Sequence, residues 1–279
     1  MNAHLLDLQE ASLMCRWAAD EGWNPGIHDA EIFLGSDPGG FFGVDVNGDL
    51  AGTISAVRYG NEFAFVGFFI VRPDLRGHLL GPCLAKAALK RIAGLPTGID
   101  GVLENVGKYK RLYGFKEAWQ NIRYQLSGPP AGTAADTLVP LASIPFDALL
   151  AFDRRYFPAE RGQFLKLWIS QRSAHALAAT SADGQLEGYG VIRPCLSGWK
   201  IGPLFAASPP VAEMIFLGLC TAAGNGPVFL DVPEPNFAAV SLAQSMGMEP
   251  VFATARMFRD SPGSIDLGGV FGITTFELG

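Results

Sequence analysis

Residues 67–81 read GFFIVRPDLRGHLLG and carry much of the information on the fold. The apolar run at 63–71 is nearly continuous, which is typical of a central strand. It ends at Pro73, and residues 82–93 then place apolar side chains at helical spacing. A strand, a glycine-containing turn and a helix in this order create an anion site, because backbone N–H groups and the helix dipole favour negative charge there.

The turn itself has two further features that suit an anion. Gly77 and Gly81 let the backbone come close to phosphate oxygens, and Arg76 can add a charge-assisted hydrogen bond. A short glycine motif is weak evidence alone, since an ordinary strand-turn-helix connection explains the same residues.

Length and charge narrow the function classes. A chain of 279 residues fits one large domain or two ordinary ones, and its 49% hydrophobic residues are enough for a large core. The net charge of −6 argues against general nucleic-acid binding and against attraction to an anionic membrane surface. We therefore expect no nucleic-acid and no membrane partner.

The absence of a signal peptide, a membrane-spanning stretch and a CxxC pair predicts the compartment and the metal content. Residues 1–10 carry two acids and no Lys or Arg, unlike a signal peptide, and the most apolar stretch, 214–223, is about half the roughly 20 residues that span a bilayer. The four cysteines form no CxxC pair, which argues against a zinc site. We expect a cytoplasmic protein without a bound metal.

An internal repeat predicts two domains. Residues 128–137 are rich in Pro, Gly, Ala and Thr and lack apolar periodicity, which is typical of a linker. Each side shows a glycine hairpin, a strand, a helix, a strand ending in Asp, and a helix ending in glycine shortly before an Arg. Such a repeat is stronger evidence than a single motif. We predict a first domain at 1–127, a linker at 128–137 and a second domain at 138–279.

The turn resembles a known family motif. Val71-x-Pro73-x-x-Arg76-Gly77-x-x-x-Gly81 is similar to motif A of the GCN5-related N-acetyltransferases (GNAT), with Leu79 in place of the middle glycine. The resemblance implies an α/β (α+β) fold of two tandem GNAT-like domains, each a mixed, mostly antiparallel sheet flanked by helices, and acetyl-CoA as co-substrate. The residues that it implies for coenzyme binding are Phe69, Ile70, Val71, Arg76, Gly77, His78, Leu79, Leu80 and Gly81.

The same resemblance suggests the catalytic residues. The helix at 105–115 reads NVGKYKRLYGF, and Tyr109 corresponds to the family tyrosine that faces the thioester, although one residue further from Gly-Phe than usual. Tyr109 is the candidate general acid for the coenzyme thiolate. Tyr113 is the alternative candidate for the general acid. The further alternative is that both tyrosines are packing residues. Glu62 is the candidate base, directly or through water, and Asp100 could orient the substrate.

The second half lacks the expected chemistry. It has no Arg-Gly turn, Pro209 and Pro210 remove two backbone donors, and Ala243 stands where tyrosine is usual. This layout resembles tandem GNAT proteins with a YitH-like C-terminal acetyltransferase domain. Its closing stretch after Pro262 could return to the domain interface. An acidic rim of Asp231, Glu234 and Glu277 would then suit a cationic acceptor, although capping of the following helix or its turn explains Asp231 and Glu234 better at each single position.

We therefore expect an N-acyltransferase that moves an acetyl group from acetyl-CoA to a primary amine by direct attack. The acceptor is a small-molecule or peptide amine that the sequence does not identify, and the oligomeric state stays open. The alternative is a non-catalytic acyl-CoA-binding sensor or scaffold, which the substituted turn and the degenerate second half favour.

Overall fold

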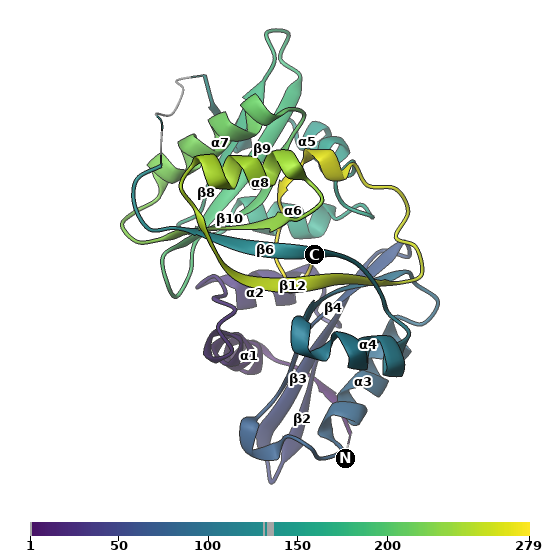
Figure 1. Cartoon of the computed structure of the whole chain (residues 1–279). Coiled ribbons are helices and arrows are strands. Elements are labelled where there is room, and N and C mark those ends of the chain that lie inside the picture. The colour runs from purple at the N-terminus through teal and green to yellow at the C-terminus, as the bar shows by residue number, and fades with distance from the viewer. Residues whose placement is uncertain (1, 131, 133–136) are drawn as a thin grey trace.

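The structure is a computed structural model that describes residues 2–130, 132 and 137–279. Positions 131 and 133–136 of the predicted linker lie outside the described residues. The remaining linker positions connect two halves that are stacked along the long axis of the molecule (Figure 1).

Both halves follow one order of elements. The first half contains β1 (His4–Leu5), α1 (Leu8–Asp20), α2 (Asp29–Ser36), β2 (Phe41–Val46), β3 (Asp49–Tyr59), β4 (Phe63–Val71), α3 (Leu80–Arg91), β5 (Thr97–Val102), α4 (Val106–Tyr113) and β6 (Lys116–Leu126). The second contains β7 (Val139–Pro140), α5 (Phe146–Asp153), α6 (Gly162–Ile169), β8 (His175–Thr180), β9 (Leu186–Pro194), β10 (Trp199–Ala206), α7 (Pro209–Ala222), β11 (Val228–Pro233), α8 (Phe237–Ser245), β12 (Glu249–Arg259) and β13 (Val270–Gly272).

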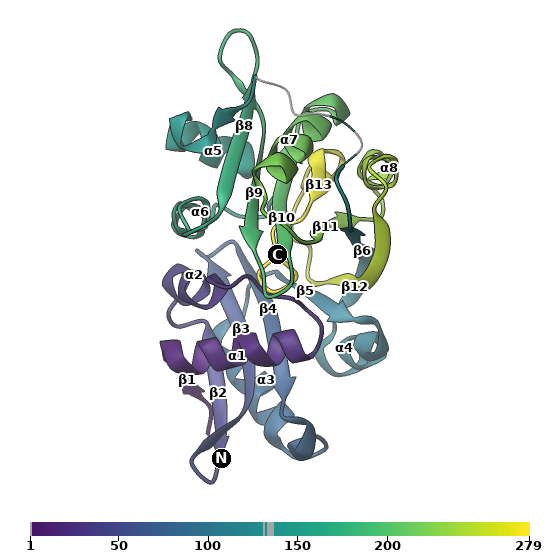
Figure 2. The same cartoon turned by 90° about the vertical axis from the view of Figure 1, so that its left-hand side faces the viewer.

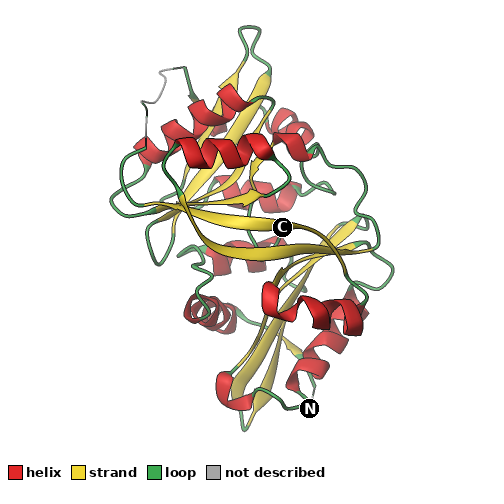
Figure 3. Cartoon of the chain, viewed as in Figure 1, coloured by secondary structure: helices red, strands yellow, loops and turns green. Residues whose placement is uncertain are grey.

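The described strands form one continuous sheet, in the order β1-β2-β3-β4-β5-β12-β6-β11-β10-β9-β8-β7, with β13 paired to β10. The pairs are antiparallel except β4–β5 and β10–β11. Helices flank the sheet in both halves (Figure 3). The expected α/β architecture, mixed and mostly antiparallel with flanking helices in both halves, is therefore confirmed.

The halves exchange their last strands. Strand β12 of the second half lies between β5 and β6, and β6 of the first half lies between β12 and β11. Figure 1 shows β6 and β12 running side by side across the middle of the molecule. The division at 128–137 stays a prediction, and the sheet itself is paired across it.

Two buried ion pairs fix the exchanged strands. Arg123 on β6 lies opposite Asp231 on β11, and Arg256 on β12 lies opposite Asp100 on β5. Both pairs are bidentate, with N–O distances of 2.6 and 2.7 Å for Arg123–Asp231 and 2.9 and 2.7 Å for Arg256–Asp100. The repeated Asp and Arg of the sequence thus join each half to the other, because each arginine reaches the aspartate of the opposite half.

The hydrophobic core also crosses between the halves. Helix α2 packs against α6, and the rings of Phe33 and Trp168 stack with centroids 6.1 Å apart. Helix α3 covers β2–β4, and α7 covers β8–β10. Each half therefore has a conventional two-layer architecture, and α1, α2 and α6 meet in one shared cluster with β4.

The closing segment, residues 270–279, is buried throughout and lies between the halves. The label at Gly279 falls at the middle of the molecule in Figures 1 and 2. A Cβ built on Gly202 would lie 2.3 Å from the Thr274 carbonyl oxygen, and one on Gly67 would lie 2.2 Å from that of Glu277. Only glycine fits at these two close approaches.

Candidate active site

Strands β4 and β5 part after a short parallel pairing. Their register covers 64–66 against 97–99 and ends there. Immediately after it, β4 carries a bulge at Phe68, whose φ is +47°. Thr53 Oγ1 donates a hydrogen bond to the Phe68 carbonyl at 3.0 Å, and Ser55 Oγ accepts one from the Gly67 N–H at 3.0 Å. Side chains of β3 thus hold the bulge in place, and such bulges commonly lie next to functional sites.

A cavity of about 640 Å³ opens where the two strands part. Residues 66–71 of β4 and 99–102 of β5 form two of its walls, and α3 and α4 contribute a third. The second half supplies Phe252, Thr254, Phe276 and Glu277. A mostly apolar cavity of this size with a few polar groups is typical of a small-molecule site.

The turn before α3 fits an anionic group. The helix has no side-chain N-cap, so the N–H groups of Leu80 and Gly81 can face a ligand, whereas Pro82 has no N–H and Cys83 donates to the Leu79 carbonyl at 3.2 Å. Gly77 has φ +89° with no heavy atom within 4 Å of a built Cβ, so glycine is favoured there by backbone conformation alone. Arg76 lines the cavity, where its Nε donates to the Val71 carbonyl at 3.0 Å and its Nη2 contacts Glu21.

The coenzyme residues predicted from the sequence divide into two groups. Phe69, Ile70, Val71, Arg76 and Gly81 line the cavity. The others, Gly77, His78, Leu79 and Leu80, form the turn beside it without lining it.

The backbone conformation at position 79 does not require glycine. Its φ is −72°, which any residue adopts, and its side chain is 78% exposed. The leucine therefore leaves the path of the backbone unstrained.

Both candidate tyrosines lie on α4 and line the cavity. The Tyr109 ring packs closely against β5, since a Cβ on Gly101 would lie 2.5 Å from its Cε2. Burial raises the pKa of Tyr109 to about 12, so the phenol stays protonated at neutral pH. Burial also raises the pKa of Tyr113. A protonated tyrosine that lines the cavity is suited to donate a proton.

Asp100 lies in the cavity wall, but its carboxylate is fully engaged. It accepts hydrogen bonds from Arg256 and, at 2.8 Å, from Asn121 Nδ2. Burial nevertheless raises its pKa, against the opposing effect of Arg256. Such a carboxylate is suited to hold the wall in place.

The other predicted acids lie away from the cavity lining. Glu62 is exposed and pairs with Arg154 at 3.0 Å. Asp231 is buried in its pair with Arg123, which lowers its pKa although burial alone would raise it. Glu234 is exposed at the end of β11. The structure thus brings Asp100 and Tyr109 together and leaves these three carboxylates outside.

Sequence reasoning did not place Trp23, Phe252 and Phe276 in this cavity. Glu277, which the sequence assigned to an acidic rim, lines it as well. For Phe276 and Glu277 there was a sequence signal. The closing stretch is rich in glycine and aromatic residues, and it predicted that the chain returns to the domain interface.

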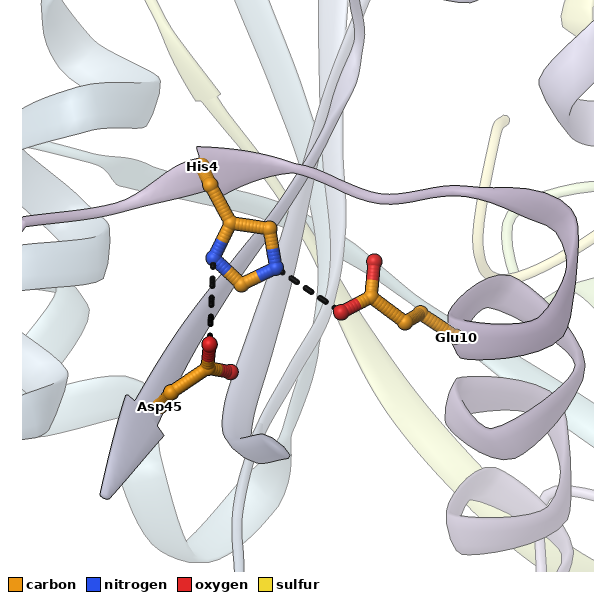
Figure 4. Close-up of side chains that lie close together, drawn as sticks. All are labelled: His4, Glu10 and Asp45. Atoms are coloured by element: carbon orange, nitrogen blue, oxygen red, sulfur yellow. Dashed lines mark hydrogen bonds and ion pairs between the residues drawn. The ribbon is translucent and has the colours of Figure 1, made fainter. Parts of the chain in front are cut away.

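A second polar group lies near the N-terminus. The His4 ring nitrogens face Glu10 at 2.9 Å and Asp45 at 3.9 Å (Figure 4). The other Glu10 oxygen accepts the Asp7 N–H at 3.0 Å in the capping box of α1. Helix capping and ion pairing account for this arrangement, and none of the three side chains lines the cavity.

Two family models divide the chain between them. The acetyltransferase (GNAT) family model matches residues 4–113, and an acetyltransferase (GNAT) domain model matches residues 149–272. This chain is a tandem GNAT protein. Its class is therefore that of N-acetyltransferase enzymes, whose co-substrate is an acyl-CoA. Across the described parts of this GNAT protein, no helix is both long and apolar enough to span a membrane.

Curated relatives and solved structures match over nearly the whole chain. The tandem GNAT protein is 28% identical to holothin acyltransferase of Pseudoalteromonas sp. (strain SANK 73390), covering 98% of this chain and 92% of that one. It is 26% identical to the uncharacterized N-acetyltransferase YitH of Bacillus subtilis (strain 168), covering 97% and 96%. A putative acetyltransferase from Pyrococcus horikoshii shares the fold, with a TM-score of 0.84, 22% identity and 99% and 95% coverage.

A further solved structure has the same two-domain arrangement. The tandem GNAT protein from the clavulanic acid biosynthesis pathway aligns with a TM-score of 0.64 at 16% identity, covering 95% of this chain and 99% of that one. The resemblance to tandem, YitH-like GNAT proteins that the sequence indicated is confirmed.

Proposed function

We propose that this protein transfers an acetyl group from acetyl-CoA to a primary amine, with Tyr109 as the general acid. The observation that carries the proposal is one cavity that is lined by the diverging ends of β4 and β5, by the start of α3, which has no side-chain cap, and by Tyr109. Each of these features suits a different part of the reaction.

Binding comes first. The N–H groups at the start of α3, with Arg76, suit the pyrophosphate of the coenzyme, since a helix N-terminus stabilises an anion. The edge of β4 beyond Val66 is free of the β5 register, so its backbone groups at 69–71 can pair with the pantetheine arm and polarise the thioester carbonyl.

Proton transfer completes the reaction. The neutral amine attacks the thioester carbon, the C–N bond forms and the C–S bond breaks. Tyr109, protonated at neutral pH, then donates its proton to the leaving sulfur. The nitrogen loses one proton as the amide forms, and that proton restores the Tyr109 phenol. The surrounding apolar wall excludes water, which would otherwise hydrolyse the thioester.

The acceptor is proposed from the cavity wall and from the relatives. Trp23, Phe252 and Phe276 favour an amine with an apolar or aromatic substituent. The whole-chain similarity to holothin acyltransferase supports a small-molecule acceptor, and holothin belongs in the amine panel.

The test combines turnover with binding. Release of coenzyme A is measured over an amine panel, and acetyl-CoA binding is measured by calorimetry. Tyr109→Phe is expected to lower kcat by roughly 10²- to 10⁴-fold and to leave the Kd for acetyl-CoA nearly unchanged. Tyr113→Phe is the matched control on the same helix, and a larger loss there would transfer the acid role to it. Binding without transfer to any amine would instead establish the sensor alternative.

A further inference from the structure

Three acidic residues line the cavity, and the carboxylates of two of them are paired with arginines. Glu21 contacts Arg76, and Asp100 pairs with Arg256 at 2.7 Å. Among the described residues none forms a salt bridge with Glu277, and its Oε1 accepts no hydrogen bond. It is only 2% exposed, and its Oε1 is among the few buried polar atoms without a partner. A buried carboxylate left unpaired is costly, so its persistence needs a functional explanation.

Glu277 is held at the point where β4 leaves β5. Its backbone carbonyl presses on Gly67, the residue just before the bulge. Thr275 Oγ1 accepts hydrogen bonds from the N–H groups of Glu277 and Leu278, at 3.2 and 2.9 Å. The Tyr59 hydroxyl donates to the Leu278 carbonyl at 2.7 Å. The residue is thus fixed by both halves beside the strand segment that would carry the thioester.

The charges around Glu277 adjust its proton affinity. Burial raises the pKa of its carboxyl group, and Lys200 counteracts this most strongly. Lys200 is itself buried, which lowers its pKa, and its Nζ donates to the Trp23 carbonyl at 3.2 Å. The titratable or charged groups that interact with Glu277 from the neighbouring elements are Lys200, Asp29, Arg123, Arg193 and Cys15. A carboxylate with a raised pKa is a stronger base than an ordinary one.

We propose that Glu277 is the general base of the transfer reaction, so that the second half supplies a catalytic residue to the site of the first. This inference rests on the proposed acyl transfer. The inference also specifies the acceptor as a primary ammonium with an apolar substituent. The Glu277 carboxylate would bind the ammonium and then deprotonate it, and the aromatic wall would contact the substituent.

The protons balance as follows. The ammonium gives one proton to Glu277, and the freed lone pair attacks the thioester carbon. The nitrogen then loses a second proton, which replaces the one that Tyr109 has given to sulfur. Glu277 finally releases its proton to water, so one proton is released for each amide and thiol formed.

The direct test is Glu277→Gln, which keeps the side-chain shape and removes the base. For an alkyl amine that is protonated at the assay pH, we expect kcat/KM to fall by roughly 10²- to 10³-fold, with the Kd for acetyl-CoA within about twofold by calorimetry. The acidic limb of the kcat/KM profile that reports the carboxyl should disappear. An aromatic amine that is already neutral should lose much less. Glu234→Gln, an exposed acid outside the cavity, is the control and should match the wild type.

A second variant guards against misfolding. Glu277→Asp keeps the carboxylate one methylene further back and should recover part of the lost rate together with the acidic limb. Wild-type kcat/KM and an unchanged profile in a folded Glu277→Gln variant would overturn the inference, as would an equal loss for neutral and protonated amines. Failure of the wild type to acetylate any amine would instead overturn the proposed function.

Discussion

The two points where parallel strands part offer an internal comparison. In the first half β4 and β5 pair over 64–66 and 97–99, and in the second β10 and β11 pair over 199–201 and 228–230. Beyond the first pairing the cavity opens. Beyond the second, β13 pairs with β10 and the Ile273 N–H bonds to the Asp231 carbonyl at 2.9 Å. The same scaffold is thus open in one half and filled by its own chain in the other.

The turns that follow differ in the same sense. Helix α3 begins with Leu80 and Gly81, which have N–H groups, and its proline comes third, whereas α7 begins with Pro209 and Pro210, which have none. Loss of the anion site and filling of the gap therefore coincide in the second half. The segment that fills one site continues directly into the wall of the other, from Thr274 at Gly202 to Glu277 at Gly67.

The largest expected effect concerns the ion pairs that join the halves. Arg123→Met or Arg256→Met would leave a buried aspartate unpaired, which costs about 3–5 kcal/mol. The measurement is the free energy of unfolding in urea. Arg154→Met is the control, because its exposed pair with Glu62 contributes at most about 1 kcal/mol. Equal losses in all three variants would show that the exchanged strands are held by something else.

A smaller effect distinguishes the two points where parallel strands part, one at β4–β5 and the other at β10–β11. Gly202→Ala and Gly67→Ala each force a Cβ against a carbonyl of the closing segment and should cost about 1–3 kcal/mol of stability. Only Gly67→Ala should also lower turnover, because it displaces Glu277. Thermal unfolding and kcat/KM together check this. Gly128→Ala is the control, because no heavy atom lies within 4 Å of a Cβ built there. A loss of activity in Gly202→Ala would contradict the assignment of catalysis to the β4–β5 site alone.

The pH dependence of stability provides a third comparison. Burial raises the pKa of Glu277 in the folded state, so folding favours its protonated form. The folded state then binds more protons than the unfolded state, and stability falls as the pH rises from the ordinary carboxyl value through the raised one. Glu277→Gln should therefore weaken this fall. Urea unfolding at acidic and neutral pH tests this prediction. Thr274→Val is the control, because the uncharged Thr274 lies against Gly202 as Glu277 lies against Gly67, and it should keep the wild-type dependence of stability on pH.

The smallest effect concerns Leu79. Its backbone is unstrained and its side chain exposed, so Leu79→Gly should change the free energy of acetyl-CoA binding by less than about 1 kcal/mol. Calorimetry measures it. A large gain in affinity would show that the leucine obstructs the coenzyme.

Local patterns predicted the local parts of this molecule well. The apolar run at 63–71 coincides with β4, and the helices expected at 82–93 and 105–115 are close to α3 and α4. These features depend on neighbouring residues, whose periodicity the sequence displays directly.

The strand exchange could not be predicted in this way. Asp100 and Asp231 occupy equivalent places, as do Arg123 and Arg256, so the sequence suits pairing within a half as well as between halves. The role of Glu277 was equally hidden, because its position depends on Gly67, 210 residues earlier in the chain, leaving room for its carbonyl. Such long-range contacts leave no periodic signal.

The strand exchange also fixes an order of events during synthesis. While residues 1–130 leave the ribosome, β5 still lacks its neighbour β12, and the cavity lacks Phe252, Phe276 and Glu277. The proposed active site is therefore completed only by β12 and residues 270–279, after most strands of the shared sheet have been synthesised. For the protein engineer, the first half cannot be excised as a minimal acyltransferase, and new acceptor specificity is best sought by changing the closing segment.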